Sequence, residues 1–129
     1  METRLKQRVR LNIEIIVRIP EGGKQKFTLA EGDSFKAGVL DISVLGIAIF
    51  SKYFLPRGLM LELEMPGAIF TINEDIKIRG EVRYSIYVRP SVYRCGIKFL
   101  DIPEKYTEAI ARFVSLNERR KEPRLRLSD

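Results

Sequence analysis

Apolar and polar residues alternate in several short stretches of this chain, which is the pattern of strands that bury one face. The clearest stretch is 11–19, where Ile13, Ile15 and Val17 alternate with Asn12 and Glu14. The same reasoning predicts a short return strand over 24–29 and further strands over 39–42, 47–50, 59–65, 76–84 and 93–100. Short strands at this spacing, joined by glycine and proline turns, predict an antiparallel β-barrel.

The period changes after residue 100. Asp101 and Glu104 have the spacing of a capping box, and Pro103 suits a first helical turn. Apolar residues then recur at helical spacing, which predicts a helix over 103–117 whose apolar face packs on the barrel. The expected organisation is a basic arm at 1–10, a barrel with its helix at 11–117, and a basic tail at 118–129.

Composition narrows the class of protein. Ile, Val, Leu and Phe make up a third of the 129 residues, enough to form the core of one domain. The chain has no histidine and a single cysteine, which removes the commonest general base, the commonest metal ligand and any internal disulfide. With no apolar run of membrane-spanning length and a polar start, we expect a cytoplasmic protein without a membrane span.

We also expect no metal, no cofactor and no enzymatic activity. Without histidine, a carboxylate pair such as Glu62 and Glu64 would be the default catalyst. Alternate strand positions place both on one solvent face, where surface polarity explains them.

The net charge of +6 lies mainly at the two ends of the chain. Arg4, Lys6, Arg8 and Arg10 precede the first expected strand, and five basic residues lie in 118–129, whereas the body is almost neutral. This distribution favours an anion that is met by the termini over a basic groove across the fold.

Two short motifs indicate which anion this chain is expected to bind. Arg4 and Arg8 form an RxxxR just before the first strand, and Asp41, Ser43 and Gly46 form a [D/N]xSxxG between two expected strands. In this order the motifs resemble a PilZ domain, and the resemblance extends over about residues 4–117, including the later strands and the helix. It implies a six-stranded, split-barrel type β-barrel with a C-terminal helix. It also implies binding of the bacterial second messenger cyclic di-GMP.

The chemistry of cyclic di-GMP fits these residue types. An arginine fork can meet phosphate oxygens or the O6 and N7 acceptors of guanine. Asp41 can accept from guanine N1–H and N2–H, Ser43 can add a hydroxyl contact, and Gly46 leaves room for the backbone to turn. Additional candidate ligand residues are Arg10, Lys98, Arg120 and Arg124. We further expect residues 1–9 to pair with no strand until ligand phosphates remove the repulsion among their basic side chains.

Some features depart from the family pattern. The family often has a second arginine where this chain has Thr3, whereas the fuller RRxxxR lies in the tail at 119–124. The tail is open to three interpretations: an ordinary charged end, the start of a second domain, or an arm that reaches a neighbouring protomer in a homo-oligomer. Asp41 and Ser43 could also act only as turn residues that bond to their own backbone.

Two other functions remain open at this stage. A small basic barrel could bind single-stranded RNA, although the stretch 83–94, with its tyrosines and arginines, lacks dense aromatic and basic interleaving and is interpreted as a hairpin with solvated edges. We therefore do not expect nucleic acid as the partner. A PilZ-like adaptor that binds no nucleotide is the other alternative. In either PilZ interpretation the barrel acts by changing its surface for an unidentified protein partner, in motility, exopolysaccharide synthesis or adhesion.

Overall fold

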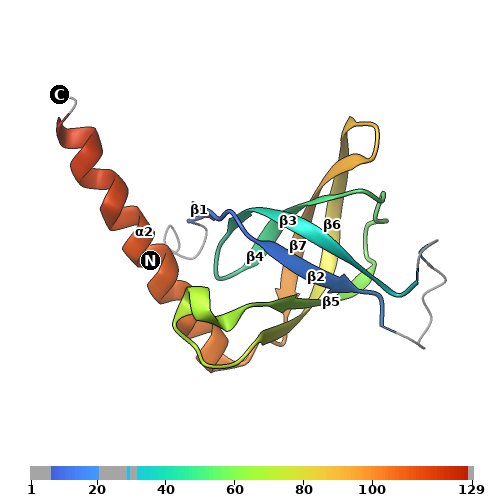
Figure 1. The fold of residues 1–129 in the computed structure, drawn as a ribbon, viewed down its shortest axis with the longest axis horizontal. Helices are drawn as coiled ribbons and strands as arrows, with labels where there is room; N and C mark the ends of the chain where they lie inside the picture. Colours follow the sequence, from blue (N-terminus) through green and yellow to red (C-terminus); the bar gives the residue numbers. More distant parts are fainter. Residues whose placement is uncertain (1–6, 21–28, 30–31, 128–129) are drawn as a thin grey trace.

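The computed structural model describes residues 7–20, 29 and 32–127 and contains seven strands, a 3₁₀ helix and one long α-helix (Figure 1). Six strands close into an antiparallel barrel in the order β3-β2-β5-β6-β7-β4, because β4 pairs back onto β3. The elements are β1 (Val9–Arg10), β2 (Glu14–Arg18), β3 (Ser34–Ile42), β4 (Gly46–Ser51), β5 (Met60–Met65), η1 (Gly67–Phe70), β6 (Ile76–Arg89), β7 (Val92–Leu100) and α2 (Glu104–Leu127).

The fold class is confirmed, and the expected strand positions are close to the observed ones. β3 and β6 are longer than predicted, since β3 begins at Ser34 and β6 continues to Arg89 in a hairpin with β7. The expected short strand at 24–29 lies outside the described residues except for Leu29, which bridges to Gly32.

The predicted first strand, 11–19, is shorter than expected, and an additional strand precedes it. β2 covers Glu14–Arg18, and the separate β1 lies earlier in the chain, where Val9 pairs with Ile42 and Arg10 pairs with Asp41. β1 and β2 both pair with β3. The expectation that residues 1–9 pair with no strand is therefore wrong for Val9, whose side chain is buried against the core.

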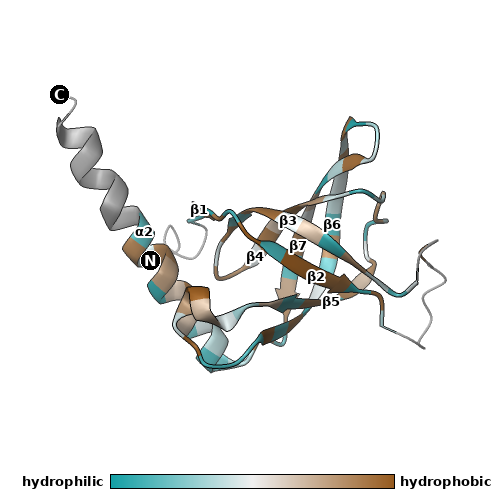
Figure 2. Cartoon of the chain, in the orientation of Figure 1, coloured by the Kyte–Doolittle hydropathy of each residue, from teal (hydrophilic) through white to brown (hydrophobic). Residues whose placement is uncertain are grey.

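The barrel interior holds apolar residues from all six strands. Hydrophobic and hydrophilic positions both occur along the strands, as Figure 2 shows. The helix α2 closes one end: Ile110 is fully buried, and the ring of Phe113 packs edge-on against Phe70 of η1 with centroids 5.1 Å apart. The helix begins one residue after the predicted start and continues ten residues past the predicted end at 117.

Two of the three register shifts in the described strands change which side chains near Arg8 face outward; the third lies between Tyr87 and Arg89. In β3 the register against β4 shifts between Val39 and Asp41, so Ile42 points into the core while Asp41 lies on the outer surface. In β6 the register against β7 shifts between Val82 and Tyr84. Strict alternation from the buried Val82 would direct Tyr84 inward, so the bulge is what places this ring outside.

Candidate functional site

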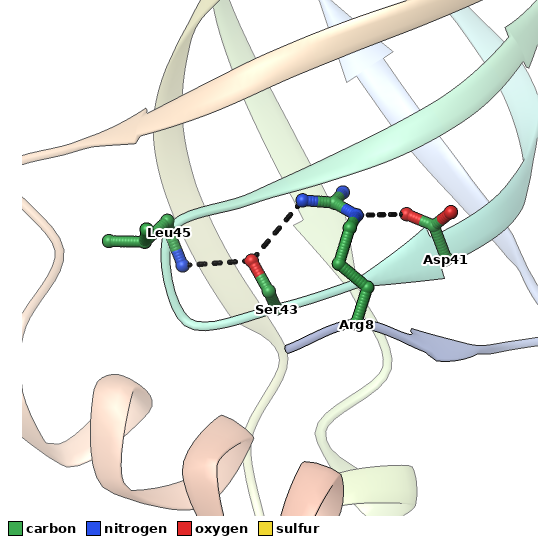
Figure 3. A network of polar contacts seen from close by, with 4 residues as sticks. All are labelled: Arg8, Asp41, Ser43 and Leu45. Atoms are coloured by element: carbon green, nitrogen blue, oxygen red, sulfur yellow. Dashed lines mark hydrogen bonds and ion pairs between the residues drawn. The ribbon is translucent and has the colours of Figure 1, made fainter. Parts of the chain in front are cut away.

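Arg8 brings the two sequence motifs together, although 33 residues separate it from Asp41. Its Nε donates a hydrogen bond to Asp41 Oδ1 at 2.5 Å, and its Nη1 donates to Ser43 Oγ at 3.3 Å (Figure 3). Arg8 directly precedes β1, whose pairing with the end of β3 places the guanidinium beside both side chains. Among the described residues, the other N–H groups of Arg8 have no partner, and its side chain is 39% exposed.

Ser43 shapes the bend between β3 and β4 as well as contacting Arg8. Its backbone N–H donates to the Gly46 carbonyl at 2.9 Å, and its Oγ accepts from the Leu45 N–H at 3.1 Å. The side chain is completely buried. Ser43 therefore acts both as a turn residue and as a contact of Arg8, because its Oγ accepts from both donors.

Gly46 is required by a close approach of two strands. A Cβ at this position would lie 2.3 Å from the carbonyl oxygen of Ile97 in β7, a distance that real Cβ atoms do not show. Any larger residue would push β4 away from β7 and widen the bend that carries Ser43.

Beside Arg8 lies an open groove of about 500 Å³ on the outer surface of β4, β6 and β7. Arg8, Arg83, Arg94 and Lys98 give it four cationic side chains. Its remaining lining is Leu45, Gly46, Ile47, Tyr84, Gly96 and Ile97.

The groove has one aromatic wall. Tyr84 lies directly over Gly96, where an added Cβ would be 2.1 Å from a ring carbon. The tyrosine ring therefore occupies space that only glycine leaves open, and it presents an aromatic surface between cationic side chains.

The predicted site residues have different outcomes in the structure. Arg8, Gly46 and Lys98 line the groove, and Asp41 and Ser43 adjoin it through Arg8. Arg10 is exposed on β1 and is not among the residues that line the groove. Arg4, and the side chains of Arg120 and Arg124, lie outside the described residues.

Sequence reasoning missed Arg83, Tyr84 and Arg94, which it assigned to a solvated hairpin. Three of the four cations of the groove belong to the body of the chain, so the sequence analysis, which found the net charge mainly at the termini, did not predict this gathering of basic side chains. The one sequence signal for this surface was the spacing of Arg94, Gly96 and Lys98. Residues at alternate positions of a strand lie on one face of it.

The resolved pKa shifts lie away from the groove. Burial raises the pKa of the Cys95 thiol, and a hydrogen bond with Ser85 partly opposes that effect. Between α2 and the segment before β6, the hydrogen bond from Lys105 lowers the pKa of Glu74, and the same contact raises the pKa of Lys105. These groups are structural and take no part in the site.

The described residues contain neither a membrane-spanning helix nor a cluster of metal-binding side chains. No helix in them is both long and apolar enough to span a bilayer. No group of three or more acidic, histidine or cysteine side chains in them is arranged to hold a metal ion.

Comparisons with known proteins identify the family of this chain. The family model described as PilZ domain matches residues 2–116. An uncharacterized protein of Aquifex aeolicus is 35% identical over 116 residues, which are 88% of this chain and 50% of that protein. This chain thus spans about half the length of the curated relative it matches.

Solved structures share the fold at low sequence identity. The inhibitor of motility of Bacillus subtilis superposes with a TM-score of 0.67 and 13% identity over 90% of this chain and 51% of that one. The complex of K. pneumonia MrkH with c-di-GMP has a TM-score of 0.59 and 21% identity, covering 89% of this chain and 53% of that one. The complex of Escherichia coli YcgR with c-di-GMP has a TM-score of 0.60 and 13% identity, covering 95% of this chain and 49% of that one. With its family-model match along most of its length, this chain belongs to the PilZ domain family.

Proposed function

We propose that this chain is a receptor domain for cyclic di-GMP, bound in the groove beside Arg8. The observation that carries the proposal is the contact of Arg8 with both Asp41 and Ser43 at the edge of a groove with four cationic side chains. The MrkH and YcgR structures that share the fold contain c-di-GMP, which supports the choice of ligand. The chain acts by binding and not by catalysis.

The phosphates and guanines of cyclic di-GMP correspond to the types of side chain that line the groove. The two phosphates need cations, and Arg83, Arg94 and Lys98 supply them along the floor. The guanines need a hydrogen-bonding edge and an apolar surface, and Tyr84 supplies a ring on which a base can stack.

The ion pair between Arg8 and Asp41 is compatible with this ligand. It uses Nε of the arginine and Oδ1 of the carboxylate, so Nη2 is left for a phosphate and Oδ2 for the N1–H and N2–H donors of guanine. Asp41 then holds Arg8 in place before the ligand arrives, which reduces the conformational entropy lost on binding. Arg8 is thus a preformed part of the site, and the ordering of an arm is not needed for it.

Calorimetry with the whole chain tests the proposal. Cyclic di-GMP should bind, and Arg8→Ala should weaken it by about 2–4 kcal/mol, which is about 30-fold to 1000-fold, because a charged bidentate donor is lost. Arg57→Ala is the matched control, since Arg57 is exposed and lies outside the groove lining. Circular dichroism should give both variants the wild-type fold.

The other functions predict different results in the same experiment. A single-stranded RNA barrel would bind an oligonucleotide more tightly than cyclic di-GMP. An adaptor that takes no nucleotide would give no heat with either. Equal affinities of the wild type and Arg8→Ala for cyclic di-GMP would remove Arg8 from the site.

A further inference from the structure

The β6–β7 hairpin extends beyond its neighbouring strands. The ladder between β5 and β6 ends at Glu81, and the ladder between β4 and β7 ends at Tyr93, whereas β6 and β7 pair as far as Arg89 and Val92. In Figure 1 this hairpin, drawn in yellow and orange, rises away from the barrel. On the β6 side, the outer half beyond Glu81 therefore pairs with no strand other than β7 among the described residues, whereas β7 keeps β4 as its neighbour as far as Tyr93.

Both faces of this outer half carry apolar side chains. Ile86 and Tyr87 point to opposite faces of β6, because successive strand residues alternate, and the exposed Val88 lies at a second shift of register between Tyr87 and Arg89. Ile86 is 55% exposed and Tyr87 is 61% exposed. A strand that met only water would carry polar residues on at least one face, so this sequence is typical of a strand with a covering partner.

The aromatic side chains on the second face gather into one cluster. Tyr93 lies between Tyr87 and Phe54, with ring centroids 5.9 Å and 5.8 Å away, and both contacts are edge-on. Phe54 is 54% exposed and comes from the segment after β4. The cluster is thus an apolar surface made by two elements.

The charge around this surface has one sign. Between Val82 and Leu100 the sequence has four basic residues and no acidic residue. Arg89, at the tip, and Arg94, opposite Ile86, have no ion pair among the described residues. An acidic partner would neutralise them, whereas a second copy of this chain would bring two uncompensated positive surfaces together.

The shape of the hairpin distinguishes a protein from a lipid surface. The tip is Arg89, Pro90 and Ser91, and the apolar residues lie behind it along the flanks. A flat bilayer would meet the polar tip first and leave Ile86 and Tyr87 in water. A protein segment that lies along the hairpin can cover them.

We propose that the outer half of the β6–β7 hairpin, with Phe54, is a docking surface for an acidic protein segment in which carboxylates alternate with apolar side chains. Ile86, Val88 and Tyr87 supply the apolar contact, and Arg89 and Arg94 supply the charge. This surface adjoins the groove through Arg94, which lines both, whereas its apolar residues Ile86, Tyr87 and Val88 are not among those that line the groove.

The test uses the whole isotope-labelled chain and two synthetic peptides. In one peptide Glu alternates with Val and Phe, and in the other Lys replaces each Glu. The Glu peptide should shift the amide resonances of 84–94, and the Lys peptide should not. The double variant Ile86→Thr and Val88→Thr, which keeps β-forming residues, should bind the Glu peptide about tenfold or more weakly.

Leu116→Thr is the control, since this leucine is exposed on α2 away from the hairpin. Three outcomes would overturn the proposal. One is hairpin resonances that respond to neither peptide or equally to both. Another is hairpin binding to phosphatidylglycerol vesicles in preference to the Glu peptide. The third is self-association in sedimentation that the double variant abolishes.

Discussion

The substitution Ser43→Ala tests whether Ser43 contributes to ligand binding or only shapes its bend. The chain contains a second buried serine that serves as a matched control. Ser43 Oγ accepts from the Leu45 N–H at 3.1 Å and from Arg8 Nη1 at 3.3 Å. Ser51 is equally buried, and its Oγ accepts from the Tyr53 N–H at 3.0 Å and donates to the Tyr53 carbonyl at 2.7 Å. Each serine side chain therefore makes two hydrogen bonds. Both bonds of Ser51 lie within its own bend, whereas Ser43 also contacts Arg8 beside the groove.

The cost in folding free energy should be similar for the two alanine variants. Each loses two hydrogen bonds, and a typical bond contributes about 0.5–1.5 kcal/mol. Water can reach Leu45 and Arg8, so the loss for Ser43→Ala should lie near 1 kcal/mol and not at the sum of two full bonds. The bond between Ser51 and the Tyr53 carbonyl is shorter, and Ser51→Ala should cost as much or slightly more.

The effect on cyclic di-GMP should differ between the variants. Ser43→Ala removes a contact that orients Arg8 and should weaken binding about tenfold, or about 1.4 kcal/mol. Ser51→Ala should leave the affinity within about twofold of wild type. Urea unfolding and calorimetry on the same preparations give both quantities. Equal affinities of the two variants for cyclic di-GMP would refute the argument and show that Ser43 only shapes the bend.

Asp41→Asn should weaken cyclic di-GMP more than cyclic di-AMP in calorimetry, because only guanine offers N1–H and N2–H to the carboxylate, and equal losses would contradict that role. Gly96→Ala should lower the free energy of urea unfolding by about 1–3 kcal/mol through its contact with the Tyr84 ring, and adding Tyr84→Ala should restore most of the loss. Cys95 should react with iodoacetamide in the folded protein at least about 100-fold more slowly than in urea, since burial both hides the thiol and raises its pKa. The same raised pKa predicts that stability contributed by the protonated thiol is lost as pH rises through and above the ordinary thiol range, which Cys95→Ala should abolish in urea titrations at several pH values.

The sequence was sufficient for the fold because its signals were local. The alternation around Ile15 and Val17, and the helical spacing of Ile110 and Val114, each report one buried face. The order of the two motifs, through the family resemblance, placed Arg8 and Asp41 in one predicted site. The structure brings the two side chains into contact through the pairing of β1 with β3, which the sequence did not predict.

The cationic groove could not be predicted, because two bulges decide which residues face it. The bulge before Asp41 and the bulge before Tyr84 each reverse the alternation of inward and outward side chains that is expected from the sequence of a regular strand. Neither bulge has a glycine or proline at its shifted residue to announce it. The extra residue in β6 is Arg83, which thereby joins the groove.

The alternation of side chains along β7 also explains why the sequence did not identify the β6–β7 hairpin as part of a groove. Arg94 and Lys98 alternate along β7 with buried Cys95 and Ile97, so they share a face with Gly96. That face becomes a groove only because β4 and β6 flank it with Gly46 and Tyr84, and this arrangement depends on long-range pairing.

The central claim is that cyclic di-GMP occupies the groove beside Arg8, and amide resonances of the whole labelled chain test it most directly. Titration with cyclic di-GMP should shift the amides of residues 8–10, 41–47 and 94–98 far more than those of α2, and Arg8→Ala should abolish these shifts at equal ligand concentration. Absence of shifts at saturating ligand would contradict the account. So would shifts confined to the separate groove of about 290 Å³ that is lined by Glu14, Lys36 and Glu64.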